Sequence, residues 1–135
     1  MIPALAAAAA GWWLAGLGWT VQATAYPAFA DVPADRWAVH HAAHSRRIGW
    51  AVGPAWVVQG IATAWWLVTS FGSLSALHAV AALAGVVLTV GWAVPVHSRL
   101  GGGFTPALHG SLLRANAVRS VVFTAAAVLA TLGAA

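Results

Sequence analysis

Residues 74–94, LSALHAVAALAGVVLTVGWAV, decide the fold class of this chain. The stretch contains no arginine, lysine, aspartate or glutamate. It is as long as the roughly 20 apolar residues that one helix needs to cross a bilayer. Apolar stretches of similar length occupy most of the remaining chain. The sequence therefore predicts an all-α integral membrane protein, built as a four-helix bundle with short loops.

The composition supports a lipid-facing surface. Of the 135 residues, 61% are hydrophobic and only 6% are charged, whereas a soluble domain carries roughly 25% charged residues. The net charge of +4 comes from arginines that lie between apolar segments, so a nucleic-acid partner is not expected. The absence of cysteine excludes disulfides and thiolate metal sites. The abundance of Ala, Gly, Val and Trp is typical of a GC-rich bacterial genome.

The chain is predicted to be a single domain over residues 1–135, with spans at about residues 2–29, 48–71, 74–99 and 106–132. Pro27 is expected to end or kink the first span, because proline disfavours helix in the residue before it. Residues 33–47 are polar on several faces and predict a helical extension of the second helix beyond the membrane. Pro54 is a candidate kink in that helix. Gly49 and Gly53 have the small-xxx-small spacing that favours close approach of another helix.

The arginines predict the orientation. All six flank the first or the third connection: Arg36, Arg46, Arg47, Arg99, Arg114 and Arg119. The second connection, residues 71–73, carries no charge. In a four-span protein the first and third connections share a side, and the arginine-rich side is expected to be cytoplasmic. We therefore predict a multi-pass protein of the bacterial inner (plasma) membrane with both termini outside.

The histidines gather on the arginine side. Five of the six precede the second span or flank the third connection: His40, His41, His44, His97 and His109. His40 and His44 are four residues apart and are expected on one helix face. His78 lies at the other end of the bundle and is interpreted as an interfacial residue. Because ionisable residues at membrane depth usually face the bundle interior and mark function, a functional site is predicted near the arginines.

Two kinds of chemistry fit these residues. The first is a copper or zinc site, since imidazole suits both metals, with His40, His44, His97 and His109 as candidate ligands. A di-iron carboxylate site is not expected, because such bundles use about four Glu or Asp ligands and this chain has only two acidic residues.

The second kind of chemistry needs no metal. A histidine can act as a base while Arg and Asn side chains stabilise an enolate or phenolate. The candidate catalytic residues are His97, His109, Asn116 and Arg119. The candidate substrate-binding residues are Gln22, Tyr26 and Arg47. Such a site, open sideways to lipid, suits an aromatic or quinone-like molecule.

Two segments carry a family resemblance. Residues 94–100, VPVHSRL, close the third helix, and residues 113–119, LRANAVR, follow near the start of the fourth. Together with the four-helix layout, these segments make the chain resemble small bacterial membrane proteins of the anthrone-oxygenase-like type. Gln22 with Tyr26-Pro27, and the group His40, His41 and His44, are also similar to a subfamily of bacterial membrane proteins. The resemblance implies oxidation of aromatic polyketides without a cofactor.

These observations favour a membrane-embedded oxidoreductase or oxygenase that acts on a lipophilic small molecule near the cytoplasmic face. The alternative is a non-catalytic accessory or scaffold subunit of a larger membrane complex, in which the same polar residues are hydrogen bonds between helices. A homo-oligomer is compatible with both. The two hypotheses differ in whether the histidines point into one pocket or outward toward headgroups.

Overall fold

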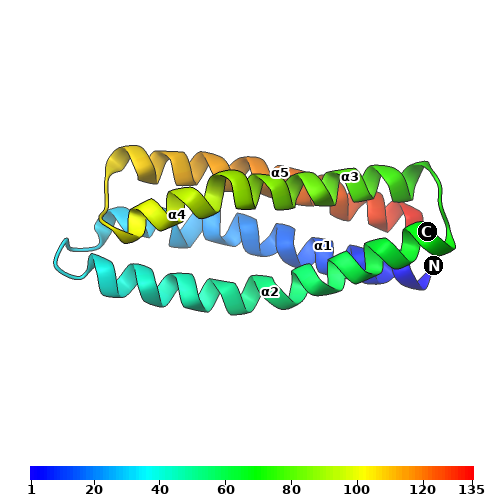
Figure 1. Cartoon of the computed structure of the whole chain (residues 1–135), viewed down its shortest axis with the longest axis horizontal. Coiled ribbons are helices and arrows are strands. Elements are labelled where there is room, and N and C mark those ends of the chain that lie inside the picture. Colours follow the sequence, from blue (N-terminus) through cyan, green and yellow to red (C-terminus); the bar gives the residue numbers. More distant parts are fainter.

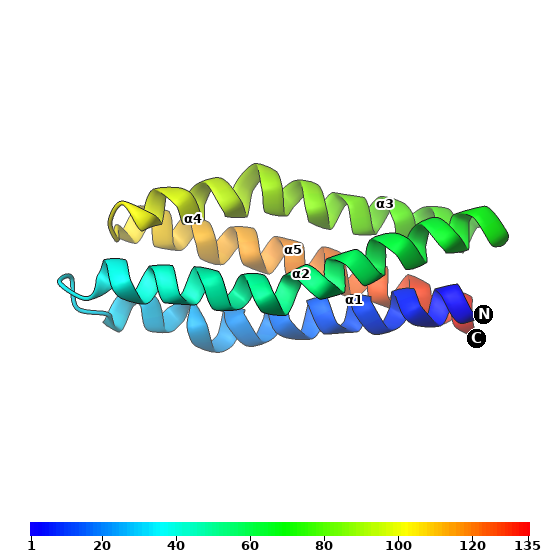
Figure 2. The same cartoon turned by 60° about the horizontal axis from the view of Figure 1, so that its bottom comes forward.

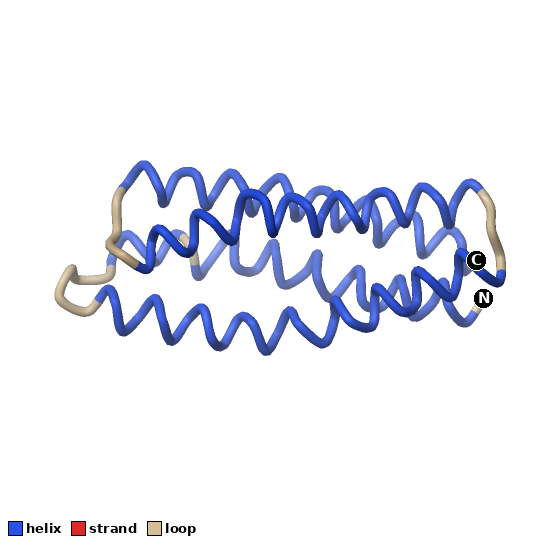
Figure 3. The backbone as a smooth tube through the Cα atoms, in the orientation of Figure 1, coloured by secondary structure: helices blue, strands red, loops and turns tan.

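The computed structural model describes residues 1–135 and contains helices but no strands (Figure 3). Four helical spans are long and apolar enough to cross a membrane: Ile2–Asp31, Trp37–Thr69, Ser73–Gly101 and Pro106–Ala134. They run side by side along the molecule with short connections (Figure 1). The predicted all-α four-helix bundle is confirmed.

Two of the spans are interrupted ahead of a proline. The first consists of α1 (Ile2–Thr20), a π-helical turn η1 (Val21–Ala25) and a 3-10 turn η2 (Pro27–Asp31). The third consists of α3 (Ser73–Leu88), a π-helical turn η3 (Thr89–Ala93) and α4 (Val94–Gly101), which contains Pro95. A proline ring clashes with the carbonyl four residues earlier, and a widened turn at that place relieves the clash. The predicted break at Pro27 is confirmed.

The other two spans are continuous helices, α2 (Trp37–Thr69) and α5 (Pro106–Ala134). α2 begins at Trp37 rather than near Pro33, because residues 33–36 form a turn in which the Arg36 amide bonds the Pro33 carbonyl. α2 bends at about its middle (Figure 2), the part of the helix that contains Pro54. Its first turns pack into the bundle, since the Trp37 indole donates to the carbonyl of Leu100 at 2.7 Å.

The topology places the arginine-flanked connections together. Both termini lie at the end of the bundle where α2 turns into α3, and the first and third connections lie at the opposite end (Figure 1). We call this opposite end, with residues 32–36 and 102–105, the arginine end. The predicted sharing of one side by the two connections is confirmed. α2 and α3 make far fewer contacts with each other than α5 makes with α1 or α3.

Small residues allow the closest contacts between helices, but the predicted pair, Gly49 and Gly53, does not make such a contact. A side chain added at Gly11 would lie 3.1 Å from Ala127, and one at Gly85 would overlap the Phe123 ring. No atom lies within 4 Å of the corresponding positions at Gly49 and Gly53. The prediction of close helix approach at these two glycines is wrong. Here α2 faces a cleft instead of a neighbouring helix.

Candidate functional site

Three side chains from three helical spans form a hydrogen-bonded chain near the arginine end. The Tyr26 hydroxyl and His97 Nε2 share a hydrogen bond of 2.9 Å. His97 Nδ1 and His41 Nε2 share the next, of 3.2 Å. Tyr26 is only 1% exposed and His41 only 6%. The arrangement connects a phenol to two imidazoles inside the bundle, so a proton can move along it.

The proline-associated turns position this chain. Tyr26 directly follows the π turn η1, and its amide bonds the carbonyl of Val21 at 3.0 Å. Its own carbonyl accepts from His109 Nε2 at 2.7 Å. His97 lies two residues after Pro95 in α4, just beyond the second π turn. Single π turns inside α-helices are frequent at functional sites, and here both lead into residues of the chain.

A second polar chain runs from α5 to α1. Arg119 Nε donates to Asn116 Oδ1 at 3.0 Å. Asn116 is fully buried, and its amide nitrogen donates to Gln22 Oε1 at 2.7 Å and to the Gly18 carbonyl at 3.0 Å. These bonds satisfy Asn116 and fix the position of the guanidinium. They also tie α5 to the first span.

The two chains meet at one cleft between α2 and the third span. The cleft has a volume of about 230 Å³. Its polar lining comes from Tyr26, His97 and Arg119, and Thr89 adds a hydroxyl. The rest of the lining is apolar or glycine, contributed by Ile48, Gly49, Val52, Gly53, Trp56, Ala93 and Val94. An apolar cleft with a few converging polar groups is the usual form of a small-molecule site.

The charge of Arg119 has no acidic counterpart in this cleft. The chain has only two acidic residues, Asp31 and Asp35, and both lie at the arginine end in or beside the first connection. Arg119 is 13 residues into α5 from Pro106, which is about 20 Å along the helix. A half-buried cation without an acidic partner favours an anion beside it. The cleft is therefore suited to an oxygen that carries negative charge.

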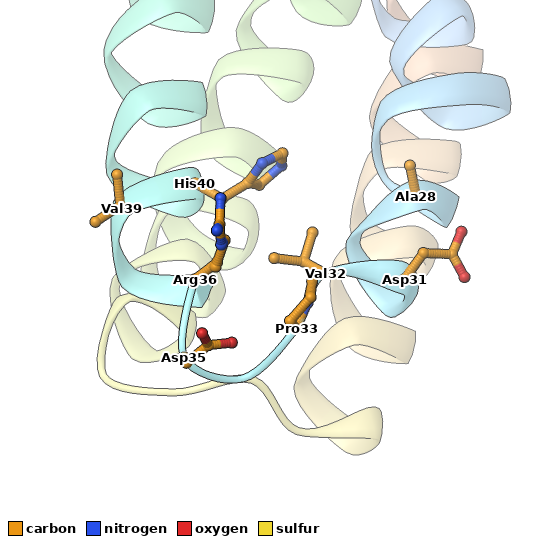
Figure 4. Close-up of a pocket in the computed structure, with 8 residues that line it drawn as sticks. All are labelled: Ala28, Asp31, Val32, Pro33, Asp35, Arg36, Val39 and His40. Carbon is orange, nitrogen blue, oxygen red and sulfur yellow. The ribbon is translucent and has the colours of Figure 1, made fainter.

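The remaining predicted residues lie around this centre. The His44 ring stacks on His97 with 5.9 Å between ring centroids, and its Nε2 is buried without a partner. Arg47 is exposed and lines a different cleft of about 400 Å³ between the first span and α2. His40 is exposed and lines an open depression of about 650 Å³ beside the first connection. The Asp31 carboxylate at the edge of this depression points away from His40 (Figure 4).

Two histidines differ from the sequence-based interpretation. His41, which was not among the candidate site residues, belongs to the central chain. It lies one turn after Trp37 on the buried face of α2, and this spacing from a large aromatic residue is the signal that could have identified it. His78 was interpreted as interfacial, and this is wrong. It is 0% exposed, with Nδ1 donating to the Ala126 carbonyl at 2.9 Å and Nε2 bonded to the Thr63 hydroxyl.

The predicted metal ligands do not converge on one point. No group of three or more His, Cys, Asp or Glu side chains is placed to hold a metal ion. His97 uses both ring nitrogens in hydrogen bonds, and Nε2 of His109 is bonded to a backbone carbonyl. A copper or zinc site made by His40, His44, His97 and His109 would require these side chains to rearrange, and it stays a prediction.

Comparisons with protein-family models, with curated proteins and with solved structures find no match to this chain. The geometry of the site therefore carries the functional argument.

Proposed function

We propose that the chain is a membrane-embedded oxidoreductase or oxygenase for a lipophilic aromatic or quinone-like substrate. The observation that carries the proposal is the convergence of Tyr26, His97 and an uncompensated Arg119 on one apolar cleft. The cleft lies between α2 and the third span, which are loosely packed against each other. A lipophilic substrate can therefore enter sideways from the bilayer.

The first step of the reaction is removal of a proton. A substrate with a phenol, or with a CH₂ group beside a carbonyl, becomes a phenolate or enolate when it loses one proton. Tyr26 takes this proton at its oxygen and gives its own to His97 Nε2, while the proton on His97 Nδ1 moves to His41 Nε2. A positioned acid–base group of this kind contributes about 10²–10⁴-fold to a rate.

Arg119 stabilises the product of that step. Its guanidinium faces the cleft and is held by Asn116, so it is placed before the oxyanion forms. Preorganised donors in a site without water stabilise developing charge strongly, by about 10²–10³ in rate for one donor. Dioxygen is then the oxidant: the CH₂ carbon becomes C=O, and the second oxygen atom leaves with both hydrogens as water. No step of this reaction passes through a metal.

The arginine end gives the proposed orientation. Both arginine-flanked connections lie there, and the opposite end holds both termini (Figure 1). Because positive residues favour the cytoplasmic side, we place the arginine end in the cytoplasm of a bacterium and the termini outside the inner membrane. The cleft then opens toward the cytoplasmic leaflet.

Oxidation of anthrone by dioxygen tests the proposal. Purified protein in detergent is mixed with anthrone as the probe, and formation of anthraquinone is followed by absorbance. Arg119→Gln should lower the rate by about 10²–10³, whereas Arg114→Gln, which removes an exposed arginine from the same helix, should leave it unchanged. A rate no higher than without protein, or equal rates for both variants, would overturn the proposal.

The accessory-subunit hypothesis rests on a different observation. Asn116 joins α5 to Gly18 and Gln22 of the first span, as expected for a hydrogen bond that holds helices together. Under this hypothesis Asn116→Ala weakens folding or assembly, and His97→Gln affects neither. A bound protein partner that co-purifies with wild type and with His97→Gln, in the absence of oxygen uptake, would favour it.

A further inference from the structure

A second cleft lies between α2 and α3, farther from the arginine end than the Tyr26–His97 chain. It has a volume of about 270 Å³, close to the lower limit of ligand pockets at about 300 Å³. Its walls include Leu67, Leu83 and Val86, and its polar groups come from α2: Trp56, Gln59 and Thr63. None of these polar side chains belongs to the proton-carrying chain described above.

Two residues that line this cleft, Gln59 and Trp56, each carry a buried hydrogen-bond donor without a partner. Gln59 is only 3% exposed, and its side-chain nitrogen is buried without a hydrogen bond. The indole nitrogen of Trp56, one turn earlier on the same helix, is also buried and unbonded. Five of the eight other tryptophans find acceptors for their N–H groups, namely Trp12, Trp13, Trp19, Trp37 and Trp92.

The two donors lie at a depth of the bilayer that lipid headgroups and bulk water do not reach. α2 is 33 residues long with Gly53 at its midpoint, so Gln59 lies six residues, or about 9 Å, from the middle of the span. The hydrocarbon layer extends about 15 Å to each side of the bilayer centre. Buried polar groups in native structures are almost always hydrogen-bonded. Two adjacent exceptions at one cleft indicate that the acceptor arrives with a ligand.

The chemistry of the lining defines the ligand. An indole N–H can only donate, so the amide of Gln59 and the indole of Trp56 together require an acceptor. Because His78 Nδ1 donates to a carbonyl, its Nε2 accepts the Thr63 hydroxyl hydrogen at 2.9 Å. Thr63 therefore contributes no free donor. No charged side chain lines the cleft, so the acceptor is a neutral oxygen on an apolar body.

We propose that this cleft is a binding site for a lipophilic molecule with a carbonyl oxygen, which accepts hydrogen bonds from Gln59 and Trp56. The site goes beyond the proposed oxidation, because its ligand needs no ionisable hydrogen and does not contact His97. The carbonyl has two possible sources: a free ketone or quinone, or the ester group of a bilayer lipid that reaches into the cleft.

The test compares two ligands that differ only in the carbonyl. 9-Fluorenone and fluorene have the same three-ring skeleton, with C=O in the first and CH₂ in the second. Binding to the purified full chain is measured by calorimetry in detergent. Fluorenone should bind more tightly than fluorene. Gln59→Leu should weaken fluorenone binding about tenfold, the effect of one hydrogen bond, and should leave fluorene binding unchanged.

The controls separate this site from the oxidation site. Trp56→Phe should also weaken fluorenone binding, but Trp56 lines both clefts, so Gln59→Leu is the decisive variant. Arg119 does not line this cleft, so Gln59→Leu should weaken fluorenone binding by the same factor in the Arg119→Gln background as in wild type. Gln59→Leu replaces an unpaired amide by an apolar group of similar size, and the ligand-free variant should unfold at an equal or higher temperature than wild type.

The source of the carbonyl is read from the lipids. If it is a lipid ester, wild type retains phospholipid through detergent exchange and Gln59→Leu loses it. If it is a free ketone, fluorenone binds equally well to protein in detergent and in lipid nanodiscs. Two results would overturn the proposal when wild type and Gln59→Leu also retain equal amounts of lipid. The first is equal affinity for fluorenone and fluorene. The second is an unchanged fluorenone affinity in both Gln59→Leu and Trp56→Phe.

Discussion

Asn116→Leu should strongly destabilise the bundle, although leucine is apolar and has the same branched arrangement of side-chain heavy atoms as asparagine. The fully buried amide makes three hydrogen bonds, two to the first span and one to Arg119. Neutral bonds between helices in a membrane contribute about 0.6 kcal/mol each, and a bond to a charged group contributes about 1.5–3 kcal/mol. The expected loss is therefore about 3 kcal/mol, mostly because Arg119 Nε loses its acceptor.

The measurement is reversible unfolding in mixed micelles with increasing fraction of an anionic detergent. Thr131→Val serves as the calibration, because its hydroxyl accepts from the Trp12 indole at 3.0 Å and donates to the Ala127 carbonyl at 2.9 Å. The loss of these two neutral bonds should cost about 1.2 kcal/mol. If Asn116→Leu costs no more than Thr131→Val, the polar chain from α5 to the first span does not stabilise the fold, and the argument that Asn116 positions Arg119 is refuted.

Three further predictions concern packing, proton transfer and metal. Gly11→Ala should destabilise the folded protein by about 1–3 kcal/mol, since the new Cβ would lie 3.1 Å from Ala127. Gly16→Ala is the control and should stabilise the protein by up to about 1 kcal/mol, because open space surrounds Gly16. Unfolding in mixed micelles compares the two variants. His41→Gln should lower kcat for anthrone about 10²-fold with little change in KM, and His40→Gln, at an exposed position, should match wild type in the same kinetics. Elemental analysis of purified protein should find less than one copper or zinc per chain, because the histidines do not converge; one bound metal that is lost in His44→Ala would show that they rearrange.

The fold was predictable from hydropathy, but the inward face of each helix was not. In a lipid-embedded helix the core and the outer surface are both apolar, so the usual contrast between faces is nearly absent. This is why His40, four residues before His44, was selected as a candidate and His41 was not, although His40 is exposed and His41 is only 6% exposed. The same ambiguity affected His78, which follows a surface connection closely yet lies on the buried face of α3 with Ser75 and Ala82.

The site residues on α5 were easier to predict, for a physical reason. Arg119 is followed by a long apolar stretch, so its charge had to be accommodated inside the bundle or at the arginine end. Asn116, one turn earlier, could then be expected on the same face, and the structure shows their bond at 3.0 Å. The cleft itself was not predictable. It depends on the loose packing of α2 against α3, where Gly49 and Gly53 suggested close contact.

The break at Pro27 links these findings into one structural argument. An uninterrupted α-helix would use the Tyr26 carbonyl for an amide one turn later and would hide it from other donors. At the transition to the 3-10 turn, that carbonyl bonds the Phe29 amide and also accepts from His109. The phenol of the same residue reaches His97 in α4. Tyr26 thus joins the first span to α4 through its phenol and to α5 through its backbone carbonyl. A proline that costs a helix one hydrogen bond supplies the acceptor and the turn that hold the proton-carrying chain in place.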